Sequence, residues 1–162
     1  MKLRRRMEGK TDYKARITML KSEKPRIVIR KTNRYITLQL VESRESKDFV
    51  LFGMSSKDLI KMGWPEKMQG RLKSLPAAYT IGFVFGKKIG EMEKTEGAIL
   101  DLGLYRPVGK SRIYAAIKGI ADSGFEIKCD EKMLPDEKRI MKQEFSAIIN
   151  NILLNKESKH NK

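Results

Sequence analysis

The charge of the first 34 residues is the feature that most constrains how this chain can fold. Thirteen of them are Lys or Arg and only three are acidic (Glu8, Asp12 and Glu23), so most of the net charge of +15 lies in one fifth of the chain. Such a segment repels itself unless a polyanion neutralises it, and it contributes little to a core. Because a phosphate backbone is the commonest cellular polyanion, the pattern predicts nucleic-acid binding.

The remaining chain is long enough to form one hydrophobic core. Of the 162 residues, 40% are apolar and 34% are charged, a mixture too rich in aliphatic side chains for wholesale disorder. Cys129 is the single cysteine and His160 the single histidine, which excludes a disulfide framework and a Cys/His metal site and favours a reducing cytoplasm. We therefore expect neither a cofactor nor a metal.

Membrane association is not expected. The N-terminus is basic and then polar, unlike a secretory signal. The longest apolar stretch covers residues 75–86, which is shorter than the about 20 residues that span a bilayer. No pattern in the chain predicts a small-molecule substrate.

Alternation of apolar and polar residues predicts secondary structure in the middle of the chain. Three short runs predict an antiparallel meander, at residues 25–30, 35–41 and 49–52, with a polar link over 42–48. A fourth strand is predicted at 98–103, parallel to a neighbour because a helix precedes it. Helices are predicted at 56–62, from Pro76 to about Glu93, at 112–122, and after Asp136.

The order β-β-β-α-β-α predicts an α/β fold, a single mixed-sheet sandwich that resembles the ribonuclease H-like arrangement. We expect a basic arm over residues 1–24, an α/β core over 25–128, and a C-terminal helix with a basic tail over 129–162. In the long helix, Ala78, Gly82, Gly86 and Gly90 recur at every fourth residue. That row of small side chains predicts close packing against the sheet.

A nuclease with this fold order needs clustered carboxylates on its first and fourth strands to hold two metal ions. The first strand instead has Arg26 and Arg30, and Asp101 is the lone acid of the fourth. Nuclease activity is therefore not expected.

The segment from Gly103 to Ser111 links a strand to a helix and ends in Gly-Lys-Ser, as a phosphate-binding loop does. That motif has four residues between its glycines, whereas five separate Gly103 from Gly109, and Pro107 lacks an N–H group. Nucleotide hydrolysis stays open as an alternative function. Phosphate binding without hydrolysis is favoured, since Arg106, Lys110, Ser111 and Arg112 gather at a helix N-terminus.

The hairpin tip at 30–35 combines cations with Tyr35, which could stack on an unpaired base. In the arm, the stretch 8–13 combines flexibility with an aromatic residue, which suits an arm that becomes ordered in an RNA groove. Three separate basic segments without catalytic groups between them predict RNA binding. Composition alone does not separate RNA from DNA, so a nonspecific DNA-compacting protein is a further alternative.

Five short segments, in a fixed order along the chain, carry a resemblance to a known family. They are residues 4–13, 24–31, 76–79, 100–107 and 134–137, which read RRRMEGKTDY, KPRIVIRK, PAAY, LDLGLYRP and LPDE. In this order the set is similar to the archaeal and eukaryotic form of the large-subunit ribosomal protein numbered eighteen in the universal series.

The resemblance implies a structural protein without catalytic activity, located in cytoplasmic ribosomes. It implies binding to 5S rRNA in the central protuberance, contact with 23S rRNA, and a place beside large-subunit ribosomal protein five. In that family the arm, the hairpin turn and the Arg-Pro loop contact RNA. The resemblance therefore implies RNA-binding roles for Arg4, Arg5, Arg6, Lys10, Thr11, Tyr13, Arg30, Lys31, Asn33, Arg34, Arg106, Lys110, Ser111 and Arg112.

Overall fold

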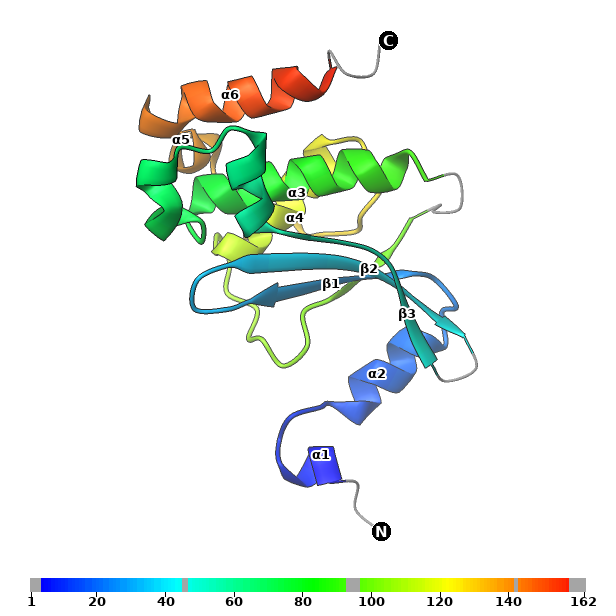
Figure 1. The fold of residues 1–162 in the computed structure, drawn as a ribbon. Helices are drawn as coiled ribbons and strands as arrows, with labels where there is room; N and C mark the ends of the chain where they lie inside the picture. Colours follow the sequence, from blue (N-terminus) through cyan, green and yellow to red (C-terminus); the bar gives the residue numbers. More distant parts are fainter. Residues whose placement is uncertain (1–3, 45–46, 93–96, 142, 158–162) are drawn as a thin grey trace.

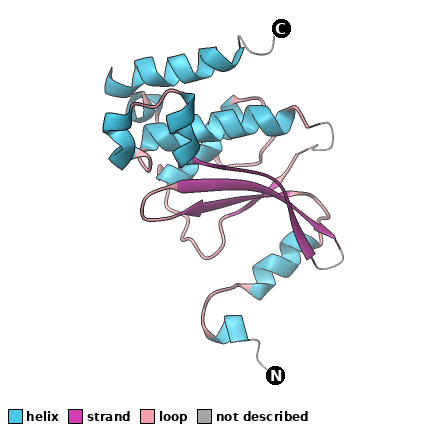
Figure 2. Ribbon diagram, in the orientation of Figure 1, coloured by secondary structure: helices cyan, strands magenta, loops and turns pink. Residues whose placement is uncertain are grey.

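A computed structural model describes residues 4–44, 47–92, 97–141 and 143–157 (Figure 1). Helices cover one face of a mixed β-sheet, and the basic N-terminal segment lies toward the other face (Figure 2). Within these residues, no helix combines the length and the apolar character needed to cross a membrane.

Four strands form the sheet in the order β3-β2-β1-β4. They are β1 (Arg26–Lys31), β2 (Ile36–Arg44), β3 (Lys47–Ser55) and β4 (Ile99–Asp101). β2 is antiparallel to β1 and β3, and β4 is parallel to β1. The predicted α/β class, the meander and the parallel fourth strand are confirmed. The likeness to the ribonuclease H-like arrangement stays a prediction.

The polar link predicted over residues 42–48 is wrong. β2 continues to Arg44 and β3 starts at Lys47, with Ser43 opposite Asp48 and Arg44 opposite Lys47. These polar residues form strand because backbone hydrogen bonds extend the hairpin beyond the buried part of the sheet. Residues 45 and 46, at the turn, lie outside the described part of the chain.

The core lies between the sheet and two packed helices, α3 (Leu75–Gly90) and α4 (Arg112–Asp122). Ile27 and Ile29 of β1 are fully buried, as are Ile36, Leu38 and Leu40 of β2. Their spacing of two places them on one face of the sheet. Ser74 caps α3 by accepting a hydrogen bond from the N–H of Ala77. Pro76 lies at the start of the helix, as predicted, but the helix ends at Gly90, and Glu93 is not described.

The predicted row of small residues packs on a helix and not on the sheet. A Cβ atom at Gly82 would overlap the carbonyl oxygen of Ala116 in α4, and one at Gly119 would overlap the carbonyl oxygen of Tyr79 in α3. The glycines therefore let the two backbones touch. Gly90 has no atom within 4 Å of such a Cβ and takes no part in this contact.

The connection between β3 and α3 contains two 3-10 helices, η1 (Ser56–Met62) and η2 (Glu66–Arg71). η1 matches the range predicted for a helix. A capping box of Ser55 and Asp58 opens it, and Gly63, with φ 105°, closes it. Only glycine adopts that φ readily, which explains why a glycine ends this helix.

The C-terminal helix is interrupted, whereas one continuous helix was predicted. η3 (Glu131–Met133) comes first, then α5 (Glu137–Ile140) and α6 (Gln143–Glu157). Met141 separates the last two, with φ −87° and ψ 54°. Ile140, Phe145, Ile149 and Ile152 are nevertheless all buried. Of the basic tail expected at the end of 129–162, residues 158–162 lie outside the described residues.

The basic arm contains two short helices, α1 (Arg4–Met7) and α2 (Tyr13–Leu20). Asp12 caps α2 and accepts hydrogen bonds from the N–H groups of Lys14 and Ala15. No residue of α2 is buried, so packing energy contributes little to its position. Its attachment to the sheet is electrostatic.

Candidate nucleic-acid interface

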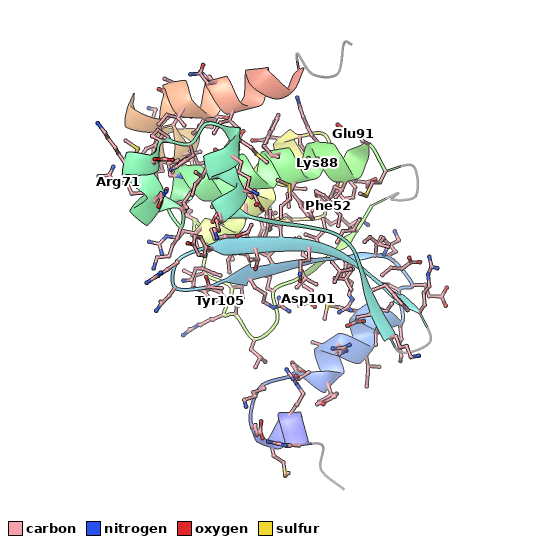
Figure 3. The ribbon with its side chains drawn as sticks, in the orientation of Figure 1. Phe52, Arg71, Lys88, Glu91, Asp101 and Tyr105 are labelled. Atoms are coloured by element: carbon pink, nitrogen blue, oxygen red, sulfur yellow. The ribbon has the colours of Figure 1, made fainter. Side chains whose placement is uncertain are left out.

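Asp101, at the end of β4, holds the two arginines of β1. It is 7% exposed. Its carboxylate accepts hydrogen bonds from Arg26 at 3.1 Å, from Arg30 at 3.0 Å and from the N–H of Gly103 at 2.8 Å. Figure 3 shows Asp101 on the sheet near the start of the β4–α4 loop. Because its oxygens are occupied by guanidinium groups, Asp101 is a structural anchor and not a metal ligand.

The ionic network continues to the arm through Asp48 on β3. Asp48 accepts hydrogen bonds from buried Arg26 at 2.8 Å and from Arg16 of α2 at 2.7 Å. The Ser43 hydroxyl donates to it at 2.6 Å. Burial alone would raise the pKa of Asp48, but the Ser43 hydrogen bond and the charges of Arg26 and Arg16 outweigh it and hold that pKa below its ordinary value. The network thus fastens the arm to the sheet.

An arm-side cavity of about 270 Å³ lies between the arm, β1 and the β4–α4 loop. It brings together three predicted arm residues, Arg5, Lys10 and Thr11, with the predicted hairpin residue Arg30. Its lining residues are Arg5, Lys10, Thr11, Asp12, Ala15, Arg16, Met19, Arg26, Arg30, Asp101, Gly103 and Leu104.

The cations of the arm already have local partners. Glu8 forms ion pairs with Lys10 and Arg4, both at 2.8 Å, and these two hydrogen bonds, that of Lys10 first, lower the pKa of Glu8. Arg5 donates to the Thr11 hydroxyl at 3.1 Å. All these pairs are exposed, so they are weak and readily exchanged for other anions.

The hairpin tip is a tight turn that presents cations to solvent. The N–H of Thr32 donates to the carbonyl oxygen of Tyr35 at 2.9 Å, and Asn33 and Arg34 between them are exposed. The Lys31 ammonium lies 4.8 Å from the centre of the Tyr105 ring. This cation–π contact joins the hairpin to the β4–α4 loop.

The β4–α4 loop does not form a nucleotide-hydrolysing phosphate loop. Lys110 has φ 57°, and its N–H donates to the carbonyl oxygen of Met133 at 2.8 Å, so that group is not free to bind phosphate. The Lys110 ammonium pairs with Asp136 at 3.2 Å. Ser111 occupies the predicted N-cap position of α4 without making a side-chain cap bond. Its buried hydroxyl oxygen has no partner among the described residues.

Two adjoining cavities, of about 240 Å³ and 260 Å³, share Leu75, Arg112 and Arg139. We call them together the loop-side groove. One is lined by Lys31, Leu75, Tyr105, Lys110, Ser111, Arg112, Ile113 and Arg139, and the other by Arg71, Ser74, Leu75, Pro76, Arg112, Arg139 and Phe145. The groove brings the predicted hairpin residue Lys31 to the predicted residues Lys110, Ser111 and Arg112.

Other predicted site residues lie outside the cavities. Arg4, Asn33, Arg34 and Arg106 are exposed, and Tyr13 is half-buried at the start of α2. Arg6 belongs to α1, and its side chain is outside the described set. Sequence reasoning did not select Arg16, Tyr105 or Arg139, which line the cavities. Arg16 lies in the basic arm and Tyr105 in the predicted loop, but only the tertiary fold shows that their side chains line a cavity, and only the fold brings Arg139 to the basic segments.

Comparison with known proteins identifies a family of ribosomal proteins. A family model described as ribosomal large subunit proteins 60S L5 and 50S L18 matches residues 1–98. The large ribosomal subunit protein uL18 of Korarchaeum cryptofilum is 45% identical over 140 residues, which cover 86% of this chain and 69% of that protein.

The protein of the same name from Methanothrix thermoacetophila is 42% identical over 137 residues, covering 85% of this chain and 78% of that protein. The uL18 protein of Methanococcus maripaludis is also 42% identical over 137 residues, covering 85% and 68%. The chain therefore belongs to the family of large-subunit ribosomal proteins that includes 60S L5 and 50S L18, and is a structural, rRNA-associated constituent of the ribosome and not an enzyme.

Proposed function

We propose that this protein binds 5S rRNA and anchors it in the central protuberance of the large subunit. In this proposal it also contacts 23S rRNA and lies beside large-subunit ribosomal protein five. Its membership of the ribosomal family supports the coarser part of the proposal. The distribution of charge on the folded chain supports the finer part.

One observation carries the proposal. The β4–α4 loop is far in sequence from the arm and from the hairpin tip, yet it lines one cavity with the arm and a second one with the hairpin. The loop therefore brings the three basic segments together in the folded chain. A folded RNA presents its phosphates in a fixed spatial pattern, and such a surface can meet several of them at once.

The residues proposed to contact RNA are those of these segments. They are Arg4, Arg5, Arg6, Lys10, Thr11, Tyr13, Arg30, Lys31, Asn33, Arg34, Arg106, Lys110, Ser111 and Arg112. We further propose that residues 1–24 act as the RNA-binding arm, 25–128 as the supporting core, and 129–162 as a C-terminal helix and basic tail.

Phosphates would replace the weak pairs that now hold the arm's cations. Arg4 and Lys10 share the single carboxylate of Glu8. One negative charge therefore faces two positive charges and neutralises only one of them. Binding would release counterions from the RNA, which makes the affinity fall steeply as salt rises. Arg30 differs, because Asp101 holds part of its guanidinium while 44% of the side chain stays exposed.

The test is the salt dependence of 5S rRNA binding by the full chain. Replacing Arg4, Arg5 and Arg6 with Ala is expected to lower the affinity and to reduce the log–log salt slope by about 2 units if three phosphate contacts are lost. The control replaces Lys57, Lys61 and Lys67 with Ala. These residues of η1 and η2 are exposed, so the control removes the same total charge from another part of the surface. An arm variant with an unchanged slope would contradict the proposal.

Competition with duplex DNA of equal length tests the DNA-compacting alternative. A protein that recognises folded 5S rRNA should retain it against such DNA at equal phosphate concentration, whereas a nonspecific phosphate binder should not. Equal competition by the two nucleic acids would favour the alternative.

A further inference from the structure

The loop-side groove differs from the rest of the basic surface in having no acid in its lining. Lys31, Lys110, Arg112 and Arg139 line one cavity, and Arg71 joins the last two in the other. Among the described residues that line the groove there is no Asp or Glu. Like charges held this close repel one another, so the fold alone gains nothing from gathering them.

Two of these cations are unpaired. The guanidinium groups of Arg112 and Arg139 make no hydrogen bond or ion pair with any side chain in the described part of the chain. Both residues are exposed, so their charges are available to a ligand. They come from α4 and α5, and both cavities include them.

The polar groups of the protein add to the positive potential. α4 has 11 residues and begins at Arg112, and its N-cap side chain leaves the first-turn N–H groups uncapped. The Ser111 hydroxyl oxygen is buried, has no partner within the described residues, and belongs to the lining. α3 begins at Leu75, which lines both cavities. Two helix N-termini therefore point their positive dipole ends toward the same groove.

We propose that the loop-side groove binds a stretch of RNA phosphodiester backbone separate from the stretch held by the arm. Arg112 and Arg139 are its central contacts, with the Ser111 hydroxyl donating to a phosphate oxygen. This inference rests on the proposed function, because it assumes that the chain binds rRNA. It adds Arg139 and the start of α3 to the RNA-binding surface, and it makes the contact with RNA two-sided.

RNA is favoured over an acidic peptide because of the side chains at the rim. Tyr105 lines the groove and is 37% exposed, which suits stacking against a nucleobase. Figure 3 shows Tyr105 on the same loop that leads away from Asp101. The exposed Arg106 follows it directly.

The experiment compares the full-length double variant R112Q/R139Q with the equally charged control K57Q/K61Q. Each is titrated with 5S rRNA and with a 23S rRNA fragment over a range of salt concentrations. We expect R112Q/R139Q to reduce the log–log slope by about 1.4 to 1.8 units on at least one of the two RNAs, the value for two lost contacts. The control is expected to keep the slope of the unmodified protein.

The conservative variant R112K/R139K keeps both charges and should retain the slope. Hydroxyl-radical footprinting then separates the two sites. R112Q/R139Q should expose one protected stretch of RNA and R4A/R5A/R6A another. The RNA that loses protection with R112Q/R139Q, 5S or 23S, is the one whose phosphodiester backbone the groove binds.

Two results would overturn the inference. The first is that R112Q/R139Q leaves the salt slope unchanged on both RNAs. If that variant also lost affinity for a poly-glutamate peptide, the groove would be a site for an acidic protein segment. The second is one footprint shared by both variants, because the groove would then be part of the arm site. Failure of the unmodified protein to bind 5S rRNA would instead refute the proposed function itself.

Discussion

The arm-side cavity and the loop-side groove adjoin the same β4–α4 loop, but their cations are in different electrostatic states. On the arm side, Arg16, Arg26 and Arg30 are bound to Asp48 or Asp101 at 2.7–3.1 Å. On the loop side, Arg112 and Arg139 have no such partner among the described residues. Basic residues thus serve different purposes on the two sides of the loop.

The difference separates cations that build the fold from cations that await a ligand. A buried arginine such as Arg26, which is 3% exposed, requires carboxylates around it because an unpaired charge is costly in the interior. An exposed arginine has no such requirement. Counting Lys and Arg along the sequence therefore overestimates the RNA-binding charge on the arm side and says nothing of its position on the loop side.

Removing the shared carboxylate of the arm side should have the largest effect. Asp101→Ala leaves buried Arg26 with Asp48 as its remaining acid and releases Arg30 and the N–H of Gly103. Breaking a buried ion pair costs about 3 kcal/mol. We expect a loss of that size in the free energy of unfolding, measured by urea denaturation.

Asp101→Asn serves as the matched variant for this experiment. It keeps the shape and some hydrogen bonds but removes the charge, so its loss should be smaller than that of Asp101→Ala. A loss below about 1 kcal/mol in Asp101→Ala would show that Asp48 and Ser43 suffice to hold Arg26.

Much of the fold is predictable because it follows from local periodicity. The alternation in residues 35–41 predicts the inward face of β2, and Ile36, Leu38 and Leu40 are indeed buried. The helices predicted at 56–62 and 112–122 match η1 and α4. Only sequence neighbours determine these features.

The interface is less predictable because its parts come from distant segments. Arg26 and Asp101 are 75 residues apart and meet since β4 runs parallel to β1, with Val28 opposite Asp101. In the sequence alone, Arg26 is a basic residue of a predicted strand and Asp101 is the lone acid of another. Arg139 was likewise outside every basic cluster of the sequence, and α5 brings it to the start of α4.

The second prediction targets the helix pair that carries the loop-side groove. In Gly119→Ala the new methyl group would overlap the Tyr79 carbonyl oxygen and lie 2.8 Å from the N atom of Phe83. Because backbone atoms cannot move aside cheaply, α4 must shift away from α3, at a cost of about 2 kcal/mol. Urea denaturation measures the loss.

Gly90→Ala is the control, since no atom lies within 4 Å of a Cβ at that position. It should keep or slightly raise the stability. The shift of α4 should also weaken groove binding while leaving the footprint of the arm in place. Equal stability of the two glycine variants would show that the helices have room to spare.

The third prediction concerns the pH at which the arm leaves the sheet. The lowered pKa of Asp48 means that the contribution of its ion pairs is fully present above the ordinary value of 3.8 and is lost as the pH falls through the lower value of the folded state. The amide NMR signal of Ile17 should therefore shift with a midpoint below 3.8. In Asp48→Asn this amide signal should already have its low-pH chemical shift at pH 7. A midpoint above the ordinary value of 3.8 in the unmodified protein would contradict this account.

The smallest effect is expected at the ion pair of Lys110 with Asp136, beside the loop-side groove. Lys110 and Asp136 pair at 3.2 Å with 46% and 59% of their side chains exposed, so the pair stabilises the fold by at most about 0.5 kcal/mol. Asp136→Ala should leave the urea midpoint nearly unchanged. It also frees the Lys110 ammonium and removes a negative charge beside the groove, so the affinity for rRNA should rise by about twofold to threefold at low salt. Filter binding at two salt concentrations measures this. Weaker binding by Asp136→Ala would mean that Asp136 holds Lys110 in the position that RNA requires, and the loop side would then depend on its carboxylate as the arm side does.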